Sequence, residues 1–402
     1  MLILFFLLLI NVATIGFSQA ILTGKVIDEA GASVAGASVF LSTTSIGTFS
    51  TADGSFAIRV LQGNYDLVVS SVGYQTHTQS ISDQNLQPIT VVLKVKAKEL
   101  ENVTVGAYDP DGWRNWGPFF IENFVGTTAI SNACKLKNPQ ALKFRHDKKK
   151  GVLNVIATQP LQIENPVLGY SITYQSEKFL FDFKNQYVFF MGYPLFKPYT
   201  GSAAKQQRWD RRRQENYAGS LQHFMRSLYR NRLLEEGFEV RRLKKMENEE
   251  RKRVSDLYRN RIAGAQQLRI NIGTDSNTYY NQVLQQPKTI NLVEPNPVPG
   301  DSIAYALDSI TAALDFPHHL LVTYTKEKAS PAYKQYNRDA GTNQTSELTL
   351  LHKKPLAVYA NGSFFAPDNL LTSGYWGWRE KLGNMLPYDY RSPESETKAP
   401  RR

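Results

Sequence analysis

The feature that most constrains the fold is a series of short strands of alternating polarity in residues 21–105. Turn signals separate these strands about every eight to twelve residues. In residues 56–60 and again in residues 65–69, successive side chains alternate between two faces, as they do in a half-buried strand. Asp53-Gly54 and Gly63-Asn64 lie between such runs, and glycine readily supplies the positive φ of tight turns. The pattern predicts an all-β sandwich with a hairpin at Asp53-Gly54.

Glycines, apolar residues and turn residues recur in this segment at Gly24, Val26, Asp28, Gly31, Val34, Gly36-Ala37, Val39, Gly47-Thr48, Asp53-Gly54, Phe56, Ile58, Gly63, Tyr65, Leu67, Ser70 and Gly73-Tyr74. At these positions the chain resembles the carboxypeptidase-regulatory-like domain, a transthyretin-like sandwich of seven strands found in secreted proteins of Gram-negative bacteria. Ser33 departs from a common proline, and Ser50-Thr51 stands where Thr-Asp is usual. The departure at Ser50-Thr51 removes an aspartate that would bind a cation or cap the loop.

The resemblance does not imply an enzyme. In zinc carboxypeptidases such a sandwich is an accessory, and the zinc site lies in a separate domain with a His-x-x-Glu motif. None of the six histidines of this chain has glutamate three residues later, so the pair that would hold zinc and supply a general base is absent from the sequence. We therefore expect no carboxypeptidase activity, no catalytic residues, no metal and no cofactor.

The N-terminus predicts export. Residues 1–20 contain no charged side chain, and an apolar run leads to the small-residue site Ser18-Gln19-Ala20. This run is shorter than the roughly 20 apolar residues of a membrane span, which favours a signal peptide cut after Ala20 over an anchor. No cysteine follows the cut, so a lipoprotein is not expected. We expect a protein of the periplasm or one associated with the outer membrane.

The net charge is uneven along the chain. It is +11 overall, from 47 Lys and Arg against 36 Asp and Glu. Residues 205–262 hold 17 Lys and Arg against 9 Asp and Glu, a net charge of +8. Such a balance would suggest nucleic acid, but export makes nucleic acid a poor candidate. The single cysteine, Cys134, excludes an internal disulfide framework, and we expect it to be a small buried hydrophobe.

After a linker at residues 106–117, the chain predicts one α+β domain over residues 118–388 and a disordered tail over 389–402. This larger region is similar to the segment that follows the sandwich in a set of uncharacterised bacterial envelope proteins. The Asp109-Pro110-Asp111-Gly112 run lacks the later ligands of a calcium loop, so we interpret it as a turn. Aromatic and β-branched runs predict strands at residues 153–156, 168–174, 179–183, 187–190, 320–324, 348–352 and 356–359.

A basic helical insertion is predicted at residues 203–264. Ser220 is suited to cap a helix that would end at Gly237, and apolar residues from Leu221 to Tyr229 follow helical spacing. The dense charge of residues 241–261 predicts a solvated helix, and residues 302–314 predict another helix. Ser220 and His223 are three residues apart, but no orienting acid or oxyanion-hole motif accompanies them. We expect a helix cap and a histidine at the edge of the core.

Two groups of side chains are candidates for contact with a ligand or partner. Large aromatic side chains can stack on sugars, although they are more often part of a core. Arginines of the basic insertion can contact lipid phosphates, lipopolysaccharide or an acidic protein, although a solvated charged face is the commoner outcome. The candidates are Trp113, Trp116, Tyr375, Trp376, Trp378, Arg226 and Arg230.

The sequence thus favours a non-catalytic, exported cell-envelope protein with a binding or scaffold role. Its expected partners are other envelope proteins or a glycan, with possible contact to anionic lipid or lipopolysaccharide through the basic insertion. The first alternative is a carbohydrate-binding protein, because transthyretin-like sandwiches resemble starch-binding folds. The second alternative is an accessory to a peptidase or a part of one, because a fold alone does not settle function.

Overall fold

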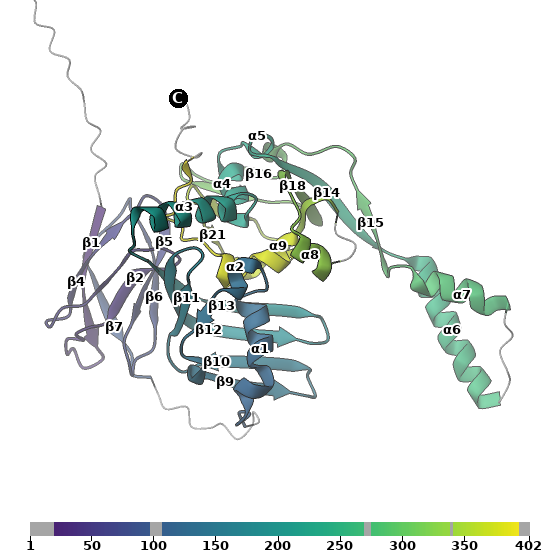
Figure 1. Cartoon of the computed structure of the whole chain (residues 1–402), viewed down its shortest axis with the longest axis horizontal. Helices are drawn as coiled ribbons and strands as arrows, with labels where there is room; N and C mark the ends of the chain where they lie inside the picture. The colour runs from purple at the N-terminus through teal and green to yellow at the C-terminus, as the bar shows by residue number, and fades with distance from the viewer. Residues whose placement is uncertain (1–19, 97–106, 269–274, 338–340, 394–402) are drawn as a thin grey trace, which may run out of the picture. The chain divides into compact units, whose positions relative to one another are not determined.

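The computed structural model describes residues 20–96, 107–268, 275–337 and 341–393 (Figure 1). The chain divides into two compact units, and we describe each by itself. The sandwich unit comprises Met1–Ser42 and Ile46–Glu99, and the C-terminal unit comprises Thr43–Ser45 and Leu100–Arg402. Except for Ala20, the predicted signal peptide lies outside the described residues. Among the described residues, no helix is both long and apolar enough to cross a membrane.

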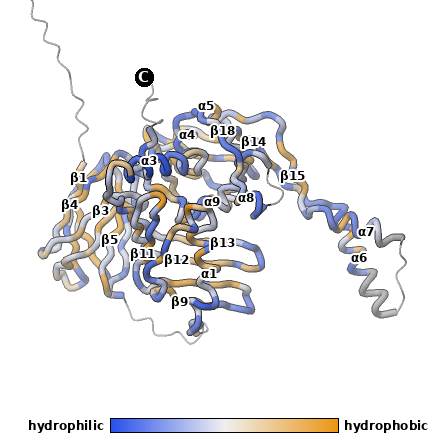
Figure 2. Tube along the Cα trace, viewed as in Figure 1, coloured by the Kyte–Doolittle hydropathy of each residue, from blue (hydrophilic) through white to orange (hydrophobic). Residues whose placement is uncertain are grey.

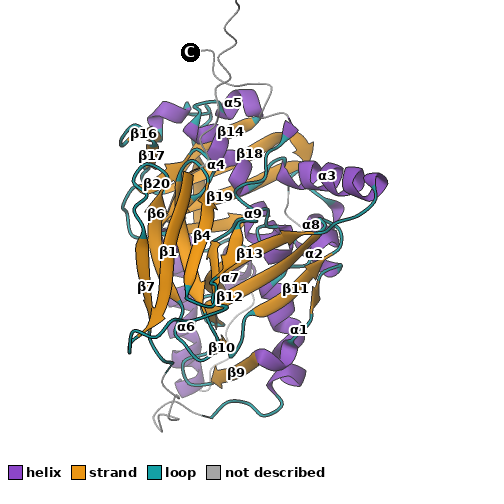
Figure 3. Cartoon of the chain, turned by 90° about the vertical axis from the view of Figure 1, so that its left-hand side faces the viewer, coloured by secondary structure: helices purple, strands orange, loops and turns teal. Residues whose placement is uncertain are grey.

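The sandwich unit contains seven strands within residues 20–96, as predicted. They form the sheets β4-β1-β7 and β3-β2-β5-β6, and the strands of the first sheet are seen side by side in Figure 3. Alternate residues of β4 and β1 are buried, including Leu22, Val26, Phe56 and Ile58. The strands are β1 (Ala20–Asp28), β2 (Ser38–Leu41), β3 (Gly47–Phe49), β4 (Ser55–Val60), β5 (Asn64–Ser70), β6 (His77–Ser82) and β7 (Ile89–Leu93).

The turn at Asp53-Gly54 is present, but it does not close a hairpin. Strand β3 before it pairs with β2, whereas β4 after it pairs with β1. Gly54 has φ +82° and approaches the Val26 carbonyl so closely that a Cβ atom would clash. The Asp53 carboxylate accepts hydrogen bonds from the hydroxyls of Thr51 and Ser55, which lower its pKa to about 2. Asp53 therefore caps the turn.

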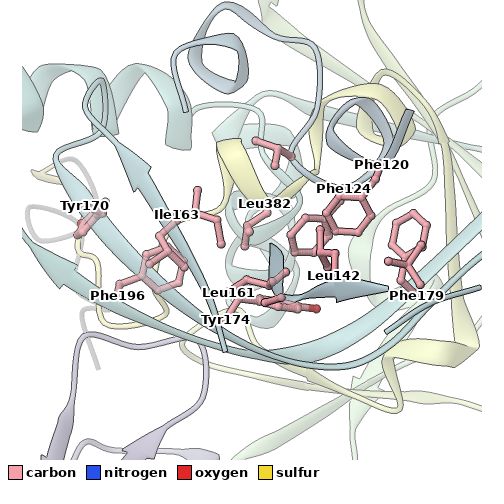
Figure 4. Packing of buried hydrophobic residues seen from close by; sticks show 14 of the residues in the cluster. Phe120, Phe124, Leu142, Leu161, Ile163, Tyr170, Tyr174, Phe179, Phe196 and Leu382 are labelled. Atoms are coloured by element: carbon pink, nitrogen blue, oxygen red, sulfur yellow. The ribbon is translucent and has the colours of Figure 1, made fainter. Parts of the chain in front are cut away.

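The first half of the C-terminal unit is a six-stranded sheet with helix α1 packed on it. The long strand β12 pairs with β11, β10 and β13. Phe120 and Phe124 of α1 contact Phe179 and Tyr174 of β12 (Figure 4). The elements are α1 (Gly112–Phe124), α2 (Ala129–Asn132), β8 (Lys135–Leu136), η1 (Pro139–Ala141), β9 (Leu142–Asp147), β10 (Val152–Ala157), β11 (Leu161–Asn165), β12 (Tyr170–Asp182) and β13 (Tyr187–Pro198).

Helix α3 (Ala203–Tyr217) is hydrophilic along most of its length (Figure 2). The side chains on its buried face nevertheless make specific contacts. The Trp209 indole N–H donates to the Pro166 carbonyl at 3.0 Å, and the Arg213 guanidinium donates to the carbonyls of Leu168 and Gly169. The same guanidinium lies 4.2 Å from the ring centre of Tyr170. These contacts fix α3 beside the turn between β11 and β12.

The second half has its own core, in which α4 packs against strands of two further sheets, β15-β14-β18-β19-β22 and β16-β17-β20-β21. Phe224 and Met225 of α4 are fully buried there with Phe238 and Trp376. The helices are α4 (Leu221–Tyr229), α5 (Leu233–Glu236), α8 (Pro331–Tyr336), α9 (Tyr375–Arg379), η2 (Gly300–Ser302), η3 (Pro367–Asn369) and η4 (Leu382–Asn384), and the strands are β14 (Phe238–Glu247), β15 (Thr289–Val293), β16 (Ala304–Ala306), β17 (Thr311–Leu314), β18 (His319–Lys328), β19 (Asn343–Leu350), β20 (Leu356–Tyr359), β21 (Phe364–Phe365) and β22 (Leu370–Gly374).

Two further helices, α6 (Glu249–Leu268) and α7 (Asp275–Gln285), lie between β14 and β15 and pack on each other. The N-terminal half of β14 pairs with β18, and its C-terminal half pairs with β15. All five residues of β15 and the last four of β14 are exposed. We call residues 244–293 the arm, which is a two-stranded ribbon that carries a helical hairpin (Figure 1).

Several predicted boundaries differ from the structure. The predicted linker 106–117 already contains the start of α1, and residues 302–314 form the β16–β17 hairpin rather than a helix. The predicted insertion 203–264 is not one helical body, because α4 lies in the core and the stretch predicted as a solvated helix begins with β14. Within the predicted disordered tail, Tyr390 and Ser392 pack into the unit. Residues 394–402 lie outside the described residues.

Candidate functional site

A cavity of about 220 Å³ lies where α3 turns into α4, beside α5 and β18. Gly219 sits in the turn with φ +67°, and a Cβ atom there would meet Tyr324 and Gln344 at 2.6 Å. Glycine is therefore required for the close approach of this turn to the sheet. Polar and aromatic side chains dominate the lining, among them Tyr217, His223, Arg230, Glu236, Tyr324 and Glu327.

His223 is the central titratable group of the cavity, and both of its ring nitrogens have partners. The backbone N–H of Gly219 donates to Nδ1 at 3.2 Å, so this nitrogen carries the lone pair. The proton is then on Nε2, which faces Glu236 Oε2 at 3.4 Å. The contact is a hydrogen bond of a neutral imidazole rather than an ion pair, because burial outweighs the attraction of Glu236 and lowers the pKa of His223.

This burial predicts a pH-dependent stability. The pKa of His223 in the folded protein lies below its ordinary value of 6.5, so the unfolded chain binds more protons below that pH. The free energy of unfolding is therefore expected to fall as pH decreases from about 6.5, by at most about 1.4 kcal/mol per pH unit from this residue. Urea unfolding at neutral and mildly acidic pH should show that His223→Gln loses less free energy of unfolding on acidification than the wild type does. The exposed His352→Gln serves as control, and equal slopes in wild type and His223→Gln would contradict the assignment.

Ser220 and His223 take the roles that the sequence predicts. The Ser220 hydroxyl accepts from the backbone N–H of His223 at 3.1 Å, so it caps α4 and is not bonded to the imidazole. Cys134 is partly buried beside the first core, and burial raises the pKa of its thiol to about 12. No group of three or more His, Cys, Asp or Glu suited to a metal ion is found in the part of the chain that the structure describes.

The two arginines predicted to contact a ligand or partner lie in different environments. Arg226 is buried and donates to the carbonyls of Asn361 and Tyr388, at 2.8 and 3.0 Å. Its guanidinium also lies 5.3 Å from the ring centre of Tyr217. Arg226 thus joins distant segments of the unit instead of facing a partner. Arg230 is only partly buried and lines the cavity.

Three of the predicted aromatic contacts lie inside the protein. Trp376 and Trp378 are 2% and 7% exposed, and Tyr375 is 5% exposed. The Trp376 indole donates to the Gly219 carbonyl, and the Trp378 indole donates to the Thr127 hydroxyl. The prediction that these rings present flat faces to a ligand is therefore wrong, because all three are buried and both indole N–H groups are used in hydrogen bonds inside the unit.

The other two predicted aromatics lie at the start of α1, near a second and more open cavity of about 400 Å³. Trp116 lines this cavity with Asp109, Asn115, His146 and Lys148. Its ring centre is 4.9 Å from that of His146, and the Asn115 amide donates to Asp109 at 2.9 Å. Trp113 is 39% exposed on the same helix. Aromatic and planar polar groups are therefore combined at this surface.

Sequence reasoning missed most of the cavity at α3 and α4. Tyr217, Glu236, Tyr324 and Glu327 come from three different elements, and none belongs to a local motif. The one available signal was the cap at Ser220, which places His223 one turn into a buried helix. Ser392 also lines the cavity and lies in the segment that was predicted to be disordered.

The comparisons with known proteins identify the first unit. Residues 22–105 match the model of the CarboxypepD_reg-like domain, so the N-terminal part of the chain is a domain of this family. No curated protein matches the chain significantly. The chain is similar to a solved DUF3823 family protein from Bacteroides ovatus ATCC 8483, with 13% identity, a TM-score of 0.17, and coverage of 46% of this chain and 82% of the other.

A second similar solved structure is a protein of unknown function from Bacteroides fragilis NCTC 9343. It has 9% identity and a TM-score of 0.16, with coverage of 86% of this chain and 92% of the other. At TM-scores this low, neither likeness adds to what the two units themselves show.

Proposed function

We propose that the protein is an exported, non-catalytic cell-envelope protein that binds a partner protein through the arm. The signal-like N-terminus and the CarboxypepD_reg-like domain support an envelope location in the periplasm or at the outer membrane. The groups that resemble catalytic ones in the sequence, Ser220 and His223, have structural hydrogen bonds instead. The main observation that supports this proposal is the exposed apolar surface of the arm.

The arm exposes apolar side chains that serve no core. Ile290 and Leu292 of β15 are 46% and 50% exposed, and Met246, which pairs with Ile290, is 45% exposed. Residues 290 and 292 lie on one face of the ribbon because side chains alternate along a strand. On the helices, Leu257 and Tyr279 are 43% and 47% exposed. Clustered exposed apolar groups are typical of protein-binding surfaces.

The charges of the arm favour a protein over an anionic lipid surface. Lys252 pairs with Glu247, Arg253 with Glu250, and Lys245 with Glu347 of β19. The first two pairs are exposed and add little stability, but all three place a carboxylate directly beside a cation of the arm. A lipid surface would be bound by cations that are not neutralised in this way.

The test removes the helical hairpin without disturbing the sheet. Glu247 and Thr289 are partners in the β14–β15 ladder, and the Asn248 N–H donates to the Lys288 carbonyl. Residues 249–287 can therefore be replaced by an Asn-Gly turn. We expect this deletion to leave the unfolding midpoint nearly unchanged and to weaken binding of a purified partner, first identified from envelope fractions, by at least about tenfold.

A double substitution tests the role of the arm without a deletion. Ile290→Ser/Leu292→Ser should weaken partner binding, while Asn291→Ser on the opposite face of β15 should not. Unchanged affinity of the deletion and of the double variant would refute the role of the arm. The measurement is titration calorimetry with the full mature chain.

Carbohydrate binding is a second candidate function, supported by the cavity beside Trp116. Sugars are bound by an aromatic face together with planar hydrogen-bonding side chains, and Trp116, Asp109 and Asn115 supply both. A glycan array probed in parallel with the wild-type and arm-deleted chains separates the two candidates. Glycan binding that survives the deletion would favour the second.

A further inference from the structure

The cavity at α3 and α4 has an acidic character within a basic protein. Its lining includes the carboxylates of Glu236 and Glu327 and a single guanidinium, that of Arg230. A third lining carboxylate, that of Glu215, is 51% exposed and already paired with Arg212 at 2.9 Å. The Arg230 Nε–H donates to the Arg226 carbonyl at 3.1 Å, so part of this cation is already used. His223 contributes no positive charge, because burial lowers its pKa. An anionic ligand is therefore disfavoured there.

Two buried polar atoms at or next to the same cavity have no partner among the described residues, one on Tyr217, which lines the cavity, and one on Gln344, which is bonded to the lining residue Glu327. Glu327 Oε2 accepts from the Gln344 amide at 2.9 Å, while the Oε1 atom of Gln344 is buried with no partner among the described residues. Tyr217 lines the cavity and is 4% exposed, and its hydroxyl is buried without a described partner. Buried polar atoms without partners are rare in proteins, because each one costs free energy. A ligand in the cavity that donates hydrogen bonds would be a partner for the Tyr217 hydroxyl, which can accept one.

From this combination we propose that the cavity binds a small organic cation that carries a primary ammonium group. The Glu236 and Glu327 carboxylates would accept its N–H donors, and the ring of Tyr324 would border its alkyl part or its charge. A volume of about 220 Å³ corresponds to roughly seven water molecules, so the ligand is about the size of a short diamine. This inference goes beyond the partner-binding role, which concerns the arm.

The test uses purified mature protein and a single probe, 1,4-diaminobutane. Titration calorimetry at physiological ionic strength, about 0.15 M, should give one binding site per chain. The neutral analogue 1,4-butanediol has the same length but no charge, and it should not bind. Glu236→Gln and Glu327→Gln keep the shape and an acceptor oxygen while they remove the charge. Each should weaken diamine binding by about tenfold or more.

Glu235→Gln is the matched control. Glu235 precedes Glu236 on the same short helix, its side chain is 68% exposed, and it pairs with Arg232. This variant should bind the diamine as wild type does. If Glu236→Gln fails to fold, as judged by its tryptophan fluorescence, the diamine affinity of Glu327→Gln alone decides whether the carboxylates bind the ligand.

Three results would overturn the proposal, namely no diamine binding by wild type, equal binding of butanediol, or unchanged affinity in the folded charge variants. These outcomes are independent of the arm. A failure here leaves the partner-binding role intact, and loss of partner binding on deletion of the arm says nothing about the cavity.

Discussion

Replacement of Trp376 by alanine is expected to destabilise the C-terminal unit by about 3–5 kcal/mol, the usual cost of removing a large buried aromatic side chain. Trp376 is 2% exposed, and its ring centre lies 5.2 Å from that of Phe224. Its indole N–H donates to the Gly219 carbonyl at 2.8 Å. The substitution would therefore leave a hole in the second core and an unpaired carbonyl in the turn that shapes the cavity.

Tryptophan fluorescence during urea unfolding is a selective measurement of this effect. All five tryptophans of the chain belong to the C-terminal unit, and residues 20–96 contain none. Trp113→Ala is the matched control, because Trp113 is 39% exposed, and it should cost less than about 1 kcal/mol. Similar losses in the two variants would contradict the assignment of Trp376 to the core.

Replacement of Arg379 by methionine is expected to cost about 2–4 kcal/mol in the same measurement, since two buried carbonyls lose their donors. Arg379 is 6% exposed, and its guanidinium donates to the carbonyls of Asn216 and Ala218 at the end of α3. Methionine keeps the apolar stem and removes only the donors and the charge.

The control for this variant is Arg211→Met on α3. The Arg211 side chain is 67% exposed and lies 3.8 Å from Glu215, and an exposed ion pair of this kind contributes little. Its loss should change stability by no more than about 0.5 kcal/mol. Arg379→Lys should restore part of the loss, because it supplies one donor group. A loss in Arg379→Met no larger than that of the control would show that these hydrogen bonds are dispensable.

The parts of the fold that the sequence predicted are those specified by local patterns. The strands of the sandwich follow from a two-residue period, and Ser220 caps α4 because its hydroxyl reaches a backbone N–H three residues later. Residues 356–359 form β20 with the predicted bounds. By contrast, residues 302–314 have a pattern compatible with a helix, but they form a hairpin because β17 pairs with β20, far along the chain.

The candidate site could be predicted only in part for the same reason. Arg226 was predicted to face a partner because its helix lies in a basic stretch, but carbonyls from Asn361 and Tyr388 satisfy the guanidinium inside the unit. Glu236 meets His223 only because a left-handed Gly237 ends α5 and returns the chain as β14. Neither contact leaves a signal in the local sequence.

The sequence by itself determined the sandwich, its family, the uneven charge and the cap at Ser220, because each of these depends on residues close together in the chain. Only the tertiary structure decided that the charged residues 241–247 belong to a strand, since that strand depends on pairing with β18 and β15. It likewise decided which cations of the arm lie beside carboxylates and which carboxylates line one cavity. Strand pairing and burial join residues that are distant in sequence, and local patterns carry no record of which residues will meet.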